Sequence, residues 1–121
     1  MDNHQRKLVG AWCADPNRGK DSWFQVNLRG RKRITGVVTQ GRDVYFEHVK
    51  TYEIEYSDES TGQWKTYSVD GKPVVFDGNC DHFTPVLNIF ANPIISRIIR
   101  IRPKTFRGAA CLRVEFFGCD A

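Results

Sequence analysis

The chain has 121 residues, 40% of them hydrophobic and 26% charged, which is the composition of one ordinary globular domain. No run approaches the roughly 18 consecutive apolar residues that a membrane-spanning helix needs. No signal peptide is visible, because residues 1–7 are polar, so a secreted form would carry its signal outside this sequence. The eight Phe, four Tyr and three Trp, beside a single Met, favour β-structure, whose pleated surface suits aromatic side chains.

The net charge of +4 is concentrated in two segments. Residues 29–33 form one basic cluster, and residues 97–107 carry five cationic side chains without a single acid. A basic surface attracts nucleic acid, anionic lipid or sulfated glycan. Basic hairpin turns and solvated strand faces would explain the same residues equally well. Charge alone therefore does not choose a ligand.

Segments in which apolar and polar residues alternate recur about every ten residues, which is the spacing of strands joined by turns. In chain order we expect strands at residues 22–28, 34–40, 51–56, 64–69, 74–76, 86–90, 98–102 and 111–119. Turns are expected at residues 29–33, 58–62, 70–71 and 92–93, where glycine, proline, asparagine, aspartate and basic residues gather. About eight antiparallel strands without a convincing helix indicate an all-β sandwich or barrel.

The closing strand, residues 111–119, is the best defined of these elements. Leu112, Val114 and Phe116 alternate with residues that would face away from the core, the pattern of a half-buried strand. A cysteine stands at each end of it, which suggests that the strand is tied down covalently.

The cysteines favour an oxidising compartment. Three pairings are open to the four of them, Cys13, Cys80, Cys111 and Cys119. None lies in a C-x-x-C arrangement, and the three histidines do not stand at zinc-ligand spacing from them. We therefore expect disulfide chemistry, no metal site and no cofactor.

Several ordered segments together resemble one family, the discoidin domain, also called the coagulation factor V/VIII type C domain. The resemblance is carried by residues 10–13, 23–28, 36–42, 75–79, 83–86, 92–97, 99–103 and 111–119. It implies a galactose-binding-like jelly-roll β-barrel whose loops at one end bind ligand. It also implies a non-catalytic module that binds anionic phospholipid, glycan, collagen or another protein outside the cell.

Two departures from the family pattern bear on the ends of the domain. We expect residues 1–121 to form a single domain that lacks the family's first strands and first ligand-binding loop. The family's final cysteine, here Cys119, is then without its usual partner. The resemblance to the collagen-receptor branch pairs Cys13 with Cys111 and leaves Cys80 as an additional cysteine. Exposed sheet edges or an unpaired cysteine would favour dimerisation.

The first candidate binding loop covers residues 42–48, where the resemblance places a ligand-binding loop. Its candidate ligand-binding residues are Arg42, Asp43, Val44, Tyr45, Phe46 and Glu47. Apolar and aromatic residues at a loop tip need a neighbour, a membrane or a ligand to contact. The alternative is that they fold back over the open end of the barrel. Arg42 matches a position that contributes to ligand binding in the collagen-receptor branch, and its alternative role is an ion pair with Asp43 or Glu47.

Two further loops are weaker candidates. In the first of them, residues 15–20, the candidate ligand-binding residues are Asp15, Asn17, Arg18 and Lys20. A solvated turn explains that composition equally well. In the second, residues 78–84, the side chains of Asn79 and Asp81 can instead cap the backbone of their own loop.

These observations together predict an extracellular, secreted or cell-surface recognition module that mediates adhesion by binding phosphatidylserine membranes through its loops. Lectin-like glycan binding is the main alternative, and binding of collagen or another extracellular protein comes third. An enzyme is not expected, because the sequence has no nucleophile elbow, zinc-protease motif or phosphate-binding glycine loop. Nucleic acid is not an expected partner, because the cysteines and the resemblance point outside the cell.

Overall fold

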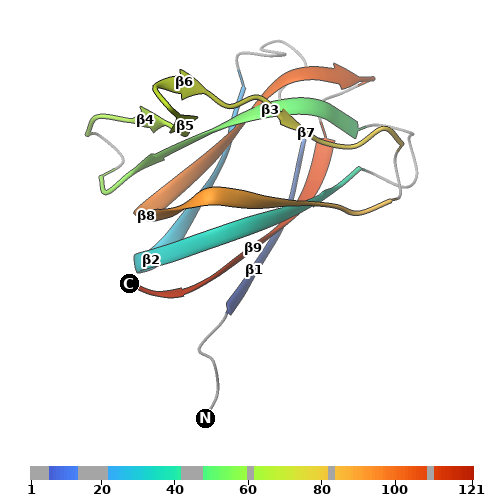
Figure 1. Ribbon diagram of the computed structural model, residues 1–121. Coiled ribbons are helices and arrows are strands. Elements are labelled where there is room, and N and C mark those ends of the chain that lie inside the picture. The colour runs from blue at the N-terminus through green and yellow to red at the C-terminus, as the bar shows by residue number, and fades with distance from the viewer. Residues whose placement is uncertain (1–5, 14–21, 42–47, 60–61, 82–83, 109–110) are drawn as a thin grey trace.

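The computed structural model describes residues 6–13, 22–41, 48–59, 62–81, 84–108 and 111–121. The regular structure in these ranges is entirely β-strand (Figure 1): β1 (Arg6–Cys13), β2 (Phe24–Gln40), β3 (His48–Ser57), β4 (Lys65–Thr66), β5 (Ser68–Val69), β6 (Lys72–Pro73), β7 (Phe76–Asp77), β8 (Val86–Arg107) and β9 (Cys111–Asp120). The predicted all-β class is confirmed. Within the described ranges, no helix has the length and apolar character needed to cross a membrane.

The strands pair antiparallel in the order β1-β9-β2-β8-β3-β4, with β7 also beside β3 and a separate β5–β6 hairpin. Two long strands, β2 and β8, bend sharply, so that each has two arms in different layers (Figure 1). The second arm of β2 (32–40) pairs with β9 and with the first arm of β8. The first arm of β2 (24–27) pairs with the second arm of β8, which also pairs with β3. The two layers enclose the core between them.

The bend in β2 corrects the prediction of two separate strands at 22–28 and 34–40. Arg29 and Gly30 have φ angles of 57° and 123°, and the register shifts between Asn27 and Lys32. The predicted turn is therefore present, but the strand continues through it, because the ladder with β8 resumes at Lys32.

The bend in β8 corrects the prediction of separate strands at 86–90 and 98–102 in the same way. The bend lies between Ser96, which pairs with the second arm of β2, and Ile98, which pairs with the first; Pro93 lies in a separate irregularity of the ladder between Ile89 and Ile94. Ser96 is 1% exposed. Its hydroxyl stabilises the bend, because it lies within hydrogen-bond distance of the carbonyl oxygens of Ser57 (2.7 Å) and Ile98 (2.8 Å). Buried polar groups are stable only with such partners.

The core confirms the predicted alternation. On β9, Leu112, Val114 and Phe116 are each no more than 2% exposed, and on β3, Tyr52 and Ile54 are fully buried. The shared core also includes Leu28, Ile34, Val37, Val49, Ile99 and Ile101. An aromatic cluster closes one side of it: Tyr52 stacks on Phe76 at 5.3 Å between ring centroids, and Tyr67 and Phe90 pack beside Phe76.

The predicted strands 64–69 and 74–76 are broken into two-residue pieces. Between β5 and β6, Asp70 and Gly71 have φ angles of 53° and 78°, which confirms the predicted tight turn. Pro73 pairs only within this small hairpin, as its lack of an N–H group predicts.

The register brings several strand ends to one end of the barrel, which we call the loop end. There Cys13 lies opposite Cys111, Gln40 opposite Arg113, and His48 opposite Arg107. Cys13 is the last described residue before 14–21, and the strands that end at Gln40 and begin at His48 flank 42–47. The described residues Cys13, Gln40 and His48, which lie next to the two predicted binding loops in the sequence, are therefore at the same end of the barrel.

Candidate functional site

The predicted ligand-binding residues themselves lie outside the described residues. This applies to Asp15, Asn17, Arg18, Lys20, Arg42, Asp43, Val44, Tyr45, Phe46 and Glu47. Their roles stay predictions, and so does the alternative that Tyr45 and Phe46 fold over the barrel. What the structure describes is the scaffold from which both segments emerge.

A pocket of about 630 Å³ lies at the loop end, and we call it the loop-end pocket. It is lined by His48, Lys50, Thr51, Asp77, Gly78, Asn79, Cys80 and Arg107. Three parts of the chain form it: the start of β3, the end of β8, and the end of β7 with the residues that follow it. The pairing of His48 with Arg107 brings the two strands together. Hydrogen bonds from Gly78 N to the Lys50 carbonyl (2.6 Å) and from Asn79 N to the Val49 carbonyl (2.9 Å) hold the segment against β3.

Two cationic side chains give this pocket its charge. Lys50 and Arg107 are both exposed, and among the described residues neither has a carboxylate within ion-pair distance. One carboxylate, that of Asp77, lines the same pocket and is exposed. Lys50, Arg107 and Asp77 together give the pocket one more positive than negative charge. The pocket can therefore hold an anionic group next to the Lys50 and Arg107 side chains, and the Asp77 carboxylate can accept a hydrogen bond from a donor on the same ligand.

The sequence reasoning missed Lys50 and did not single out Arg107 from its basic stretch. Arg107 lies beside His48 only because the two residues pair across β3 and β8. That pairing depends on the register of β3 and β8, which the alternation of either strand does not specify. No local signal in the sequence marks Lys50 as part of a pocket.

In the 78–84 segment, the side chains of Asn79 and Asp81 make the hydrogen bonds of the structural alternative. The Asn79 side-chain NH₂ donates to the carbonyl oxygens of Thr39 (3.0 Å) and Thr84 (2.7 Å). The Asp81 carboxylate accepts hydrogen bonds from the backbone N–H and the hydroxyl of Thr84, both at 2.7 Å. The interpretation that these side chains cap their own loop is confirmed for the described part of the segment.

Most of the remaining basic residues with described contacts are neutralised on a strand face. The Arg100 guanidinium lies 3.6 Å from the ring centroid of Trp64 and 4.5 Å from that of Trp23. Its neighbour Arg102 pairs with Glu55 at 3.3 Å, and Lys104 pairs with Glu53 at 3.6 Å. These residues therefore make structural contacts on a strand face, but that face is only partly solvated, since the Arg100 side chain is 16% exposed.

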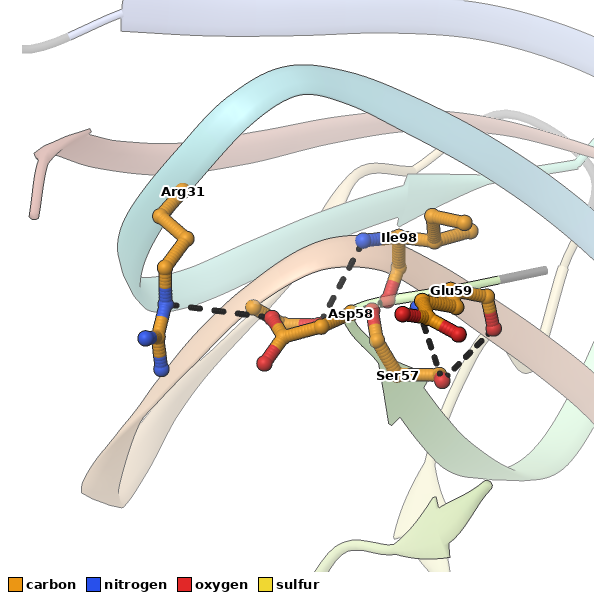
Figure 2. A network of polar contacts seen from close by, with 6 residues as sticks. Arg31, Ser57, Asp58, Glu59 and Ile98 are labelled. Carbon is orange, nitrogen blue, oxygen red and sulfur yellow. Dashed lines mark hydrogen bonds and ion pairs between the residues drawn. The ribbon is translucent and has the colours of Figure 1, made fainter. Parts of the chain in front are cut away.

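The opposite end of the barrel holds the predicted basic turn (Figure 2). Arg31 Nε lies 3.8 Å from an Asp58 oxygen (Figure 2). In the same view, the Ser57 hydroxyl donates to the Glu59 carbonyl and accepts from the Glu59 N–H. Outside that view, Lys32 Nζ lies 2.5 Å from an oxygen of Asp120. Arg31 and Lys32 are therefore paired with acidic side chains, whereas Lys50 and Arg107 at the loop end have no such partner among the described residues.

The cysteines separate into two kinds. Cys111 is 1% exposed and disulfide-bonded, and Cys13 is its neighbour in register on β1. The register therefore supports the predicted Cys13–Cys111 pair, which stays a prediction. Cys80 and Cys119 are free thiols, and they lie at opposite ends of the barrel, since Cys119 pairs in register with Arg33 beside the β2 bend.

Comparison with known proteins identifies the family. Residues 2–116 match the family described as the F5/8 type C domain. The chain belongs to this family. It is 36% identical to lactadherin of Rattus norvegicus over 121 residues, 98% of this chain and 27% of the relative. It is 45% identical to coagulation factor V of Bos taurus over 116 residues, 93% of this chain and 5% of the relative.

Solved structures agree on the fold. Recombinant discoidin II of Dictyostelium discoideum superimposes with a TM-score of 0.75 at 24% identity, over 85% of this chain and 39% of that one. A family 32 carbohydrate-binding module of the Clostridium perfringens protein NanJ, solved with galactose, superimposes with a TM-score of 0.58 at 14% identity, over 93% of both chains. The predicted discoidin-like, galactose-binding-like fold is confirmed.

Family membership also decides the broad class of function. F5/8 type C domains are non-catalytic binding modules, and the related proteins are extracellular. Both predictions are confirmed at this level. The chain spans about a quarter or less of the curated relatives it matches, so what those whole proteins do does not transfer to it directly.

Proposed function

We propose that this domain binds phosphatidylserine-containing membranes through the loop end, as an adhesion module of an extracellular or cell-surface protein. The observation that carries the proposal is the loop-end pocket, where Lys50 and Arg107 are exposed and without carboxylate partners among the described residues. Both residues lie within two positions of the His48–Arg107 pair, so their positive charge is available at the loop end.

The chemistry of the head group suits this pocket. Phosphatidylserine presents a phosphate, a carboxylate and an ammonium group close together. Lys50 and Arg107 would donate hydrogen bonds to the anionic oxygens, and the Asp77 carboxylate would accept from the ammonium. This arrangement would favour phosphatidylserine over phosphatidylcholine, whose quaternary ammonium cannot donate a hydrogen bond.

The predicted loops would add apolar insertion to this polar recognition. Burying Tyr45 and Phe46 in the membrane interface would contribute roughly 1.5–3 kcal/mol each. Each cationic residue near an anionic surface would add about 1 kcal/mol, which covers Lys50, Arg107 and, on the loops, Arg42. The upper part of that sum, about 8–9 kcal/mol before ordering costs, corresponds to about micromolar affinity. A multivalent parent protein would bind far more tightly.

Glycan binding is the second candidate. The loop-end pocket combines the Arg107 guanidinium, the Asp77 carboxylate and a volume of about 630 Å³, which suits a hydroxyl-rich ligand as well as a phosphate. The carbohydrate-binding module solved with galactose shares the fold at 14% identity. Collagen or another extracellular protein remains the third candidate, and a dimer formed through sheet edges or a free cysteine stays a prediction.

Co-sedimentation with liposomes tests the proposal. The purified domain is mixed with vesicles of phosphatidylcholine alone or with added phosphatidylserine, at low and at physiological salt. Binding that requires phosphatidylserine and persists at physiological salt is the expected result. Binding that disappears with added salt would reveal surface charge only and contradict the proposal. Absence of binding to either vesicle would contradict it as well and favour the glycan, to be tested on a glycan array.

A further inference from the structure

Asn79 joins three strand ends at the wall of the loop-end pocket. It is 2% exposed, although it lies between an exposed cysteine and a half-buried glycine. A buried amide in a connecting segment requires an explanation, because polar groups are costly to bury without partners. Its hydrogen bonds supply that explanation, since they end on β2, on β3 and on the segment that precedes β8.

The side-chain NH₂ of Asn79 donates to the Thr39 carbonyl at 3.0 Å and to the Thr84 carbonyl at 2.7 Å. Both partners are carbonyl oxygens that can only accept, so the amide must present its nitrogen to them. The backbone N–H of Asn79 donates to the Val49 carbonyl at 2.9 Å. Asn79 thus contacts the end of β2, the start of β3 and the segment that leads into β8.

The preceding residue makes this close approach possible. Gly78 N donates to the Lys50 carbonyl at 2.6 Å. A Cβ at position 78 would lie 2.7 Å from the Val49 carbonyl oxygen and 3.2 Å from that of Lys50. Only glycine therefore allows the segment to lie directly on β3, where Asn79 can reach across to β2.

The link matters because no strand pairing supplies it. In the described part of the chain, β2 pairs with β8 and β9, and β3 pairs with β4, β7 and β8. The end of β2 and the start of β3 belong to different layers, and Asn79 connects them. The start of β3 carries Lys50, and the segment on which Asn79 lies carries Asp77.

We propose that Asn79 is a positioning residue for the loop-end pocket: its amide holds β2, β3 and the 77–84 segment together so that Lys50 and Asp77 face the same ligand as Arg107. It acts through these residues and does not need to contact the ligand itself. The inference rests on the proposed function for its binding readout, whereas its structural part stands independently.

A pair of truncations separates positioning from stability. Asn79→Ala removes a buried side chain that donates to two backbone carbonyls at the loop end. Ser96→Ala removes a buried side chain that contacts two backbone carbonyls at the opposite end. We expect both to lower the thermal midpoint, but only Asn79→Ala to weaken binding to phosphatidylserine vesicles, by about tenfold. Asn79→Ser keeps one hydrogen-bond donor, so its affinity for the vesicles should lie between that of Asn79→Ala and that of the wild type. It replaces Asn79→Ala in the test if that variant does not fold.

Amide hydrogen exchange gives a readout that needs no ligand. The Gly78 and Asn79 amides donate to β3, so their protection reports whether the segment stays docked. We expect the Asn79 variants to lose that protection and Ser96→Ala to keep it. Unchanged exchange at both amides would overturn the inference. Equal weakening of vesicle binding by Ser96→Ala and Asn79→Ala would overturn it too. If the wild type binds no vesicles, the proposed function fails, and the exchange measurement alone decides the role of Asn79.

Discussion

Two double variants, each of which removes two positive charges but at opposite ends of the barrel, test whether the loop end binds membranes. The test variant is Lys50→Ala with Arg107→Ala, and the control is Arg31→Ala with Lys65→Ala. Each pair removes two positive charges. The first pair lines the loop-end pocket, and the second lines a separate pocket of about 280 Å³ at the opposite end. Any difference between them therefore reports position rather than net charge.

The expected magnitude follows from the exposure and pairing of these side chains. Each of Lys50 and Arg107 should contribute about 1 kcal/mol near an anionic surface, so losing both costs about 2 kcal/mol, or about 30-fold in affinity. Stability should change little, because both are exposed and have no described ion pair. The control pair loses only the Arg31–Asp58 contact of 3.8 Å between half-exposed groups. Such a surface pair contributes about 0–1 kcal/mol.

The assay is a titration with vesicles that contain phosphatidylserine at physiological salt, with the thermal midpoint of each variant measured in parallel. The control pair should bind within about twofold of the wild type, because charges more than a Debye length of about 8 Å from the surface are screened. Equal losses for the two pairs would refute the reasoning, since binding would then follow net charge. A large drop in thermal midpoint for the loop-end pair would also refute it, because those residues would then support the fold.

Three further predictions address the loop, the sheet and the core. Tyr45→Ala with Phe46→Ala should abolish vesicle binding and leave the thermal midpoint within a few degrees; a large drop would mean that the loop is core. Gly118→Ala should cost about 1–3 kcal/mol in urea unfolding, since its Cβ would overlap the Arg33 carbonyl oxygen, and an unchanged midpoint would contradict that clash. Burial raises the pKa of the Tyr52 hydroxyl well above its ordinary range, so the folded state holds this proton more tightly than the unfolded chain. Stability from this source is present below about pH 10 and declines above it. Tyr52→Phe should flatten that decline in unfolding measured between about pH 9 and 11, and an equally steep decline would exclude Tyr52 as its source.

The two bent strands explain where the strand predictions stopped short. Alternation identified parts of both arms of each strand, and the turn-forming residues around Arg29 and Pro93 fall where the β2–β8 ladder is irregular. It could not show that the ladder resumes after each bend. Continuity depends on partners such as the Ile34–Ile94 pair, which come from distant parts of the chain. Backbone hydrogen bonds to a neighbouring strand, rather than local propensity, decide whether a bend ends a strand.

In the candidate site, too, the sequence predicts some features and leaves others to contacts between distant segments. The resemblance predicts ligand-binding loops at 15–20 and 42–48, and the register places the flanking residues Cys13, Gln40 and His48 at one end of the barrel. Lys50 and Arg107 could not be selected in advance, because nothing in their own neighbourhoods in the sequence distinguishes them from other surface cations. Their common pocket requires His48 to pair with Arg107 and Gly78 to lie against β3.

The sequence by itself determined the all-β class, the inward faces of strands such as Leu112, Val114 and Phe116, and the family. These depend on a two-residue period and on ordered motifs, which are properties of neighbouring residues. Only the tertiary structure decided which cations remain unpaired, which loop side chains cap their own backbone, and that Asn79 links two layers. The physical reason is that each of these depends on contacts between segments far apart in the chain, whose register local patterns leave open.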